Sequence, residues 1–157
     1  MNKKVIEDFM TNMENINSDR GAMAKAERYV LAGDFITASS VVERFVPAFA
    51  KEWERKCFYV VAGLFAYHSA VAKHGNLGDT IRIIASKMRE KAIEKRFLKL
   101  VALERDELLD SLFAMVSLAK STSVSINYVQ LLTDLIYWGD KVRHRWAISF
   151  YHNSKGE

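Results

Sequence analysis

Residues 126–151, INYVQLLTDLIYWGDKVRHRWAISFY, contain the pattern that decides the fold of this chain. Apolar residues recur every three or four positions on both sides of Gly139, which is typical of amphipathic helices. We predict one helix over 126–138 and a second that Asp140 caps. In the second helix Val142, Trp146 and Phe150 share one face, which we expect to be buried.

The same C-terminal helix carries three cations outside its aromatic face, namely Lys141, Arg143 and Arg145. Guanidinium groups can grip phosphate bidentately, whereas a lysine acts as a point charge. A buried aromatic face beside a group of cations favours a packed helix whose outer side meets an anionic partner. The aromatic residues could also stack on nucleic-acid bases, but their helical spacing favours packing in the core.

The composition supports an all-α fold of eight or nine short helices. The chain has 157 residues, half of them hydrophobic, with only one Pro and seven Gly. The helices before residue 126 are predicted at 3–14, from a Ser18 or Asp19 cap to Ala32, at 36–45, from Pro47 to about Val71, and at 81–88, 90–103 and 106–119. Within the Pro47 helix we expect an inward face of Phe49, Trp53, Cys57, Val60, Val61, Leu64 and Phe65.

The clearest loop is 73–78, KHGNLG, and it is the best candidate for a boundary. It would divide an N-terminal helical lobe, 1–72, from a C-terminal helical bundle, 79–152. The two lobes would pack tightly or form a single domain. Asp79 or Thr80 would cap the helix after the loop, and Ser125 would cap the helix over 126–138.

Positive charge is densest between Arg82 and Arg105, in a chain of net charge +4. In the predicted helix over 90–103, Lys91, Lys95 and Lys99 recur every four residues and Arg96 flanks them. Such a stripe opposite an apolar face suits an anionic partner such as nucleic acid. The same pattern is also typical of a solvated face that Glu94 partly neutralises. Arg20, Lys25 and Arg28 form a smaller cluster in the second predicted helix.

Catalytic and metal-binding patterns are missing from the sequence. The four histidines have no partner at helical spacing, and no phosphate-binding glycine loop is present. The lone Cys57 lies on an apolar face and resembles a small hydrophobic residue more than a nucleophile. We therefore expect no enzymatic activity, cofactor or metal. One Cys and an acidic, non-apolar N-terminus favour the cytoplasm over a secreted or membrane location.

Nearly the whole chain resembles CasB, the small-subunit family of the type I-E CRISPR Cascade complex. The most specific match is Leu131-Leu132-x-Asp134-Leu135-x-x-Trp138 followed by Val142-x-x-Arg145-Trp146-Ala147-x-x-Phe150-Tyr151. Weaker similarities are Arg20-Gly21-x-x-Ala24 with Arg28, the apolar stretch 59–68 and Glu94-Lys95-Arg96-Phe97-x-x-Leu100. Glu27, Phe113 and Ala114 depart from the family, which often has cations at those positions.

The resemblance implies a non-catalytic, all-α subunit of an antiviral surveillance complex. Its partners would be the large subunit, the backbone subunits, a second copy of the chain, guide RNA and target DNA, and no membrane. Its basic surfaces would hold the target and displaced strands and so stabilise the R-loop. The residues implied to contact nucleic acid are Arg20, Arg28, Lys95, Arg96, Arg143 and Arg145, and the charge pattern adds Arg82, Lys99 and Lys141.

Two alternatives stay open at the level of the sequence. A free helical DNA-binding regulator would need varied base-reading side chains on one helix, and the lysine-rich stripe lacks that variety. A purely structural adaptor would use the same stripe against acidic protein surfaces. That adaptor would bind other subunits without any affinity for nucleic acid.

Overall fold

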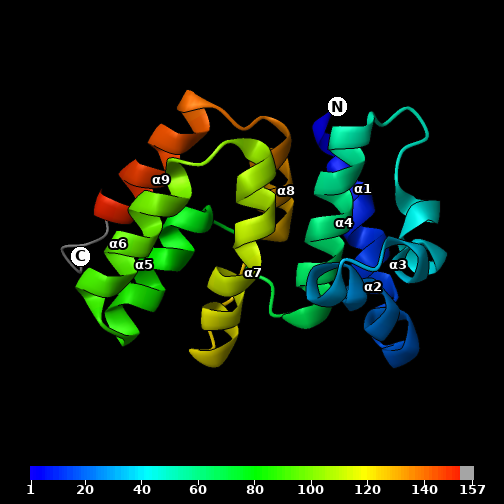
Figure 1. Cartoon of the computed structure of the whole chain (residues 1–157), viewed down its shortest axis with the longest axis horizontal. Coiled ribbons are helices and arrows are strands. Elements are labelled where there is room, and N and C mark those ends of the chain that lie inside the picture. The colour runs from blue at the N-terminus through cyan, green and yellow to red at the C-terminus, as the bar shows by residue number, and fades with distance from the viewer. Residues whose placement is uncertain (153–157) are drawn as a thin grey trace. The chain divides into compact units, whose positions relative to one another are not determined.

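The computed structural model describes residues 1–152. Within this range it contains helices and one isolated β-bridge, and no β-strand. Over the same residues the chain forms nine α-helices, which are labelled in Figure 1, and one 3₁₀ helix. They are α1 (Lys3–Asn15), α2 (Arg20–Ala32), α3 (Phe35–Val42), η1 (Glu43–Phe45), α4 (Glu52–Tyr67), α5 (Leu77–Lys87), α6 (Glu90–Val101), α7 (Arg105–Ser121), α8 (Tyr128–Ile136) and α9 (Asp140–His152). The prediction of an all-α fold is confirmed.

The chain divides into two compact units, one of residues 1–69 and one that begins at Ala70. The first unit contains α1 to α4, and the second contains α5 to α9. The predicted loop 73–78 follows this division closely along the chain. Each unit has a hydrophobic core of its own, and each is described separately below.

In the first unit, α2 packs against α4 and α3. A Cβ at Gly63 of α4 would lie 2.8 Å from Cγ1 of Val30, so the two helices meet closely at this glycine. The buried side of α1 consists of Ile6, Phe9, Met10 and Met13, and the Phe9 ring meets Phe58 edge-on at a centroid distance of 4.8 Å. Of the two predicted caps, Asp19 is the one that caps α2, which ends at Ala32 as predicted. Gly33 follows with a left-handed φ of 65°.

The fourth helix starts later and ends earlier than predicted. Pro47 lies in a turn closed by a hydrogen bond from Ala50 N to Pro47 O, and α4 begins at Glu52. The Glu54 carboxylate accepts a hydrogen bond from the Lys51 backbone N–H at 2.8 Å, which satisfies a donor at the helix start. The prediction that Phe49 and Trp53 point inward is therefore wrong, because they are 67% and 37% exposed. The other five predicted inward residues of α4 are buried.

In the second unit, α5 packs against α6, α7 and α9. Close contact with α9 depends on Gly78, where a Cβ would lie 2.9 Å from the Trp146 carbonyl carbon and closer still to its oxygen. The predicted aromatic face of α9 is buried, with Trp146 and Phe150 fully covered. The Phe97 ring of α6 stacks on Phe150 at a centroid distance of 4.4 Å.

Two predicted helix starts in the second unit are wrong. Asn76, not Asp79 or Thr80, caps α5, because its side chain and that of Asp79 each accept a hydrogen bond from the other's backbone N–H. Asn127, not Ser125, caps α8. Ile126 cannot be helical because its backbone forms an isolated bridge with 70–72, through Ile126 N to Ala70 O and Ala72 N to Ile126 O, both at 2.9 Å.

Candidate nucleic-acid interface

The α6 basic face, defined here as Lys91, Lys95, Arg96 and Lys99, is the largest group of exposed cations on one described helix. All four side chains are exposed, while Ile93, Phe97 and Leu100 are buried on the opposite side of α6. Within residues 1–152, no hydrogen bond or ion pair occupies any of the four cations. Four unpaired cations along about two helical turns repel one another, and a bound polyanion would relieve that repulsion.

Glu94 lies beside the α6 basic face and contacts α9. Its carboxylate accepts a hydrogen bond of 2.6 Å from the Tyr151 hydroxyl of α9. Burial, together with this hydrogen bond, raises the pKa of Tyr151 to about 12. Glu94 therefore links α6 to α9 at the edge of the basic face, and its negative charge offsets only part of the positive field of the four cations.

On α9, Lys141 and Arg145 are exposed and make no hydrogen bond or ion pair with any described residue. Arg145 still exerts an electrostatic pull on the buried Asp134 carboxylate of α8. These two cations lie away from the buried side of α9, as the sequence predicts. They are therefore available to a partner in solution.

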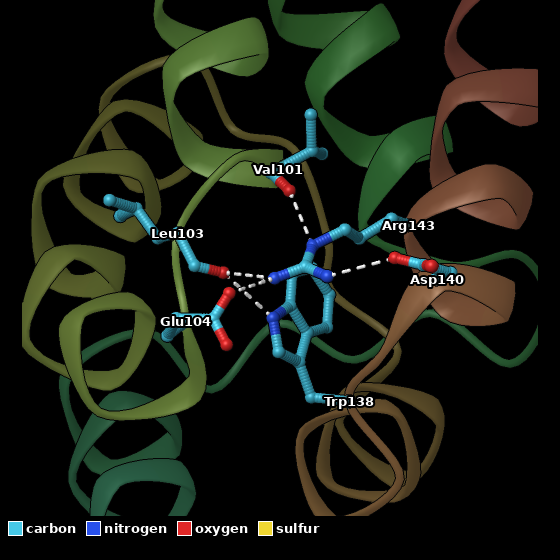
Figure 2. Close-up of polar contacts among 6 residues, drawn as sticks. All are labelled: Val101, Leu103, Glu104, Trp138, Asp140 and Arg143. Carbon is cyan, nitrogen blue, oxygen red and sulfur yellow. Dashed lines mark hydrogen bonds and ion pairs between the residues drawn. The ribbon is translucent and has the colours of Figure 1, made fainter.

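Arg143 is on the same helix but serves a different purpose, as Figure 2 shows. Its guanidinium donates to the carbonyl oxygens of Val101 and Leu103 at 2.9 and 2.8 Å, at the C-terminal end of α6. It also pairs with Glu104 at 2.9 Å and Asp140 at 3.1 Å, and it lies 5.3 Å from the centre of the Trp138 ring. Carbonyls at a helix C-terminus lack helical partners, so Arg143 satisfies them and ties α9 to α6.

Arg82 is also used inside the second unit. It is only 7% exposed, and its guanidinium donates to Glu90 at the start of α6. The guanidinium carbon lies 4.7 Å from the centre of the Phe150 ring, within the range of a cation–π contact. Arg82 thus joins α5, α6 and α9, and it does not contribute to the exposed charge.

The smaller cluster of cations on α2, namely Arg20, Lys25 and Arg28, differs from the α6 basic face because one of its members forms an ion pair. Arg20 and Lys25 are exposed, but Arg28 donates to Asp34 at 2.9 Å. Asp34 also accepts from the Thr37 backbone N–H, and this bond together with Arg28 lowers the Asp34 pKa to about 2. Arg28 remains half exposed, so it can meet an anion only while competing with Asp34.

Two arrangements in the second unit were missed from the sequence. Arg105 donates to the carbonyl oxygens of Leu135 and Ile136, so it caps the end of α8. The buried carboxylate of Asp134 accepts hydrogen bonds from Trp146 Nε1 at 2.7 Å and Gln130 Nε2 at 2.8 Å. An acid inside the apolar run LLTDLI was a signal that Asp134 needs buried partners.

The model of the family described as CRISPR-associated protein Cse2 matches residues 20–151 of this sequence. The chain belongs to the Cse2 family. A curated Cse2 protein from Thermus thermophilus is 34% identical over 109 residues, which are 64% of this chain and 59% of that protein. The matched part thus spans less than two thirds of the relative's length.

Solved structures have the same Cse2 fold over a larger share of the chain. The crystal structure of CasB from Thermus thermophilus matches with a TM-score of 0.81 and 27% identity, covering 94% of this chain and 97% of that one. CasB from M. ruber matches with a TM-score of 0.71, 27% identity and 87% coverage of both chains. A chain of a CRISPR RNA-guided surveillance complex matches with a TM-score of 0.81 and 20% identity, covering 97% of this chain and 96% of that one. At this identity the match shows a similar fold and nothing more.

The Cse2 C-terminal motif consists largely of residues that hold the second unit together. Trp146 and Asp134 bond to each other, Trp138 Nε1 donates to Leu103 O at 2.9 Å, and the Trp138 and Trp146 rings meet at 4.9 Å. Within residues 1–152, no helix has the length and hydropathy of a membrane span. In the same range, no three His, Cys, Asp or Glu side chains gather as metal ligands would.

Proposed function

We propose that this chain is the non-catalytic small subunit of a type I-E CRISPR Cascade complex, where its exposed cations hold the DNA strands of the R-loop. The observation that carries the proposal is the α6 basic face, four exposed cations without partners among the described residues of a Cse2-family protein. Further support comes from the similar fold of a chain in an RNA-guided surveillance complex. The other partners would be the large subunit, the backbone subunits, a second copy and the guide RNA.

The proposed contacts are the exposed cations of three helices. They are Lys95, Arg96 and Lys99 with Lys91 on α6, Lys141 and Arg145 on α9, and Arg20 and Arg28 on α2. Arg82 and Arg143 leave the set predicted from sequence, because their guanidinium groups are already bonded within the second unit. Contacts of this kind go to phosphates and do not read bases, which suits a complex whose guide supplies the sequence specificity.

A modest contribution from such a clamp is enough to matter. The guide–target heteroduplex is about as stable as the DNA duplex that it replaces, so R-loop formation is nearly balanced. Each phosphate of a single strand neutralised by a cation steepens the dependence of log K on log salt by about 0.7. A few phosphate contacts can therefore shift the equilibrium without any catalysis.

The proposal is tested with the triple variant Lys95→Glu, Arg96→Glu and Lys99→Glu in the reconstituted complex. We expect assembly to be retained and the affinity for matched target DNA to fall by at least about tenfold. The salt slope should become shallower by about 2, because about three phosphate contacts are lost. Electrophoretic titration at several salt concentrations measures both quantities.

The matched control reverses three exposed lysines outside the proposed contacts, Lys3→Glu, Lys4→Glu and Lys73→Glu, which changes the net charge equally. Its target affinity should stay close to that of the wild type. Equal affinities for the α6 triple variant and the wild type would remove the α6 basic face from the mechanism. Loss of the triple variant from the assembled complex would favour the structural adaptor.

A further inference from the structure

An open groove of about 250 Å³ lies in the second unit, where the end of α6 meets the middle of α7. Its buried wall is apolar and includes Leu100 and Met115, which are 6% and 5% exposed. Exposed Ala114 of α7 lines its opening, as do Arg96 and Lys99 of the α6 basic face. An apolar recess and two unpaired cations thus share one site.

The wall of the groove is held in place by the contacts of Figure 2. Leu103 lines the groove, and its carbonyl oxygen accepts from Trp138 Nε1 and Arg143 Nη2 at 2.9 and 2.8 Å. The hydroxyl of Ser111, which also lines the groove, donates to the Glu107 carbonyl at 2.8 Å. The recess is therefore preformed, and its one hydroxyl donor is already used.

We infer that this groove receives one unstacked base of single-stranded nucleic acid, with the adjoining phosphates on Arg96 and Lys99. The inference rests on the proposed function and adds to it a base-binding subsite. A single nucleotide carries a flat, largely apolar ring and an anion side by side, which matches the apolar wall and the two cations. An apolar protein side chain would fill only the recess and would need separate acidic neighbours to meet the charge.

The chemistry of the groove favours binding without regard to base identity. The side chains of Leu100 and Leu103 have no hydrogen-bonding atom, and the Met115 thioether is only a weak acceptor, so they cannot distinguish one base edge from another. Every base has a π-face that can lie against the Met115 sulfur. A clamp that serves any guide sequence requires such indifference, because base pairing with the guide reads the target.

The test compares two fluorescent single strands of about twelve nucleotides, a length that spans a typical single-strand site. One carries adenine at every position, and the other has the same phosphodiester backbone with abasic tetrahydrofuran sugars. The full-length protein is titrated with each strand at low salt by fluorescence anisotropy. We expect the strand with bases to bind at least about tenfold more tightly, which corresponds to about 1.4 kcal/mol.

Ala114→Phe fills the groove without removing a cation, and Ala114→Leu does so with a smaller side chain. Either variant should bind the base-bearing strand no more tightly than the abasic one, while its affinity for the abasic strand stays unchanged. Ala48→Phe, an equal enlargement at an exposed residue of the other unit, should keep the wild-type preference. Thermal melts identify any variant that fails to fold. If Ala114→Phe does not fold, Ala114→Leu is used for the comparison in its place.

Several outcomes would overturn the inference while leaving the proposed function to its own test on the assembled complex. These are equal wild-type affinity for the two strands, no binding of either strand, and an unchanged preference in both Ala114 variants. A folded Ala114→Phe variant could instead keep its preference for the base-bearing strand and recover less of the partner subunits. That result would show that the groove binds a protein segment. Arg96→Gln with Lys99→Gln should weaken both strands alike, and a loss confined to the base-bearing strand would contradict the phosphate contacts.

Discussion

At the scale of single residues, the arginines of the second unit divide into two groups with different chemistry. Arg82, Arg105 and Arg143 donate to carbonyl or carboxylate oxygens of their own unit. Arg96 and Arg145 extend into solvent with no bonded partner among the described residues. Since arginine always carries its charge, its role depends on which acceptors the fold brings near it.

Replacing Arg143 should therefore destabilise the fold more than it weakens DNA binding. In Arg143→Ala the carbonyls of Val101 and Leu103 lose their donor, and we expect the free energy of unfolding to fall by about 2–4 kcal/mol. Lys141→Ala, at an exposed site on the same helix, should change it by less than about 0.5 kcal/mol. Urea denaturation measures the free energy of unfolding of both variants. A near-wild-type midpoint for Arg143→Ala would show that its hydrogen bonds add little.

Asp134 predicts a pH dependence of stability. Burial raises the pKa of its carboxyl above the ordinary value of 3.8, and hydrogen bonds from Trp146 and Gln130 offset only part of this effect. The folded state then binds the proton more tightly than the unfolded state. Between the unfolded and the folded pKa, the free energy of unfolding must fall as the pH rises, and above the folded pKa the loss is complete.

Asp134→Asn removes this titration while its side-chain oxygen can still accept from Trp146. The free energy of unfolding of the variant, relative to that of the wild type, should increase as the pH rises from about 4 to about 7. Urea denaturation of both proteins at intervals across this range gives the comparison. A relative stability that stays flat or decreases over the range would contradict the raised pKa.

At the scale of elements, the contact between α5 and α9 depends on a residue with no side chain. Gly78 belongs to the loop 73–78 by its sequence pattern, yet it lies in the first turn of α5. The α9 backbone at Trp146 occupies the place where a Cβ would be. The chain thus uses this glycine for close packing of helices rather than for a turn, and Gly63 has the same role between α4 and α2.

Gly78→Ala should destabilise the second unit by about 1–3 kcal/mol, because α5 and α9 must move apart to admit the new methyl group. Gly21→Ala is the matched control, since Gly21 also lies in a first helical turn and its new Cβ would meet no atom closer than 3.5 Å. That change should be neutral or stabilise by up to about 1 kcal/mol. Thermal melts distinguish the two, and equal melting temperatures would argue against the close contact.

At the scale of the whole molecule, the second unit separates its aromatic residues from its free charges. The Cse2 motif residues Trp138, Trp146 and Asp134 bond to one another or to Leu103, and they fix α8, α9 and the end of α6. The proposed nucleic-acid contacts lie on the exposed sides of α6 and α9, supported by this core. The C-terminal residues on which the sequence resemblance rested thus hold the second unit together, and the cations beside them remain exposed.

The sequence by itself determined the helical class, the buried faces of α6 and α9 and the end of α2 at Ala32. These features depend on spacing within one helix or on the conformation of one residue, and both are local. The tertiary structure decided where α4, α5 and α8 begin, why Gly78 is a glycine and which arginines stay free. Those outcomes depend on backbone carbonyls, carboxylates and ring faces that distant segments bring together, and no local pattern encodes them.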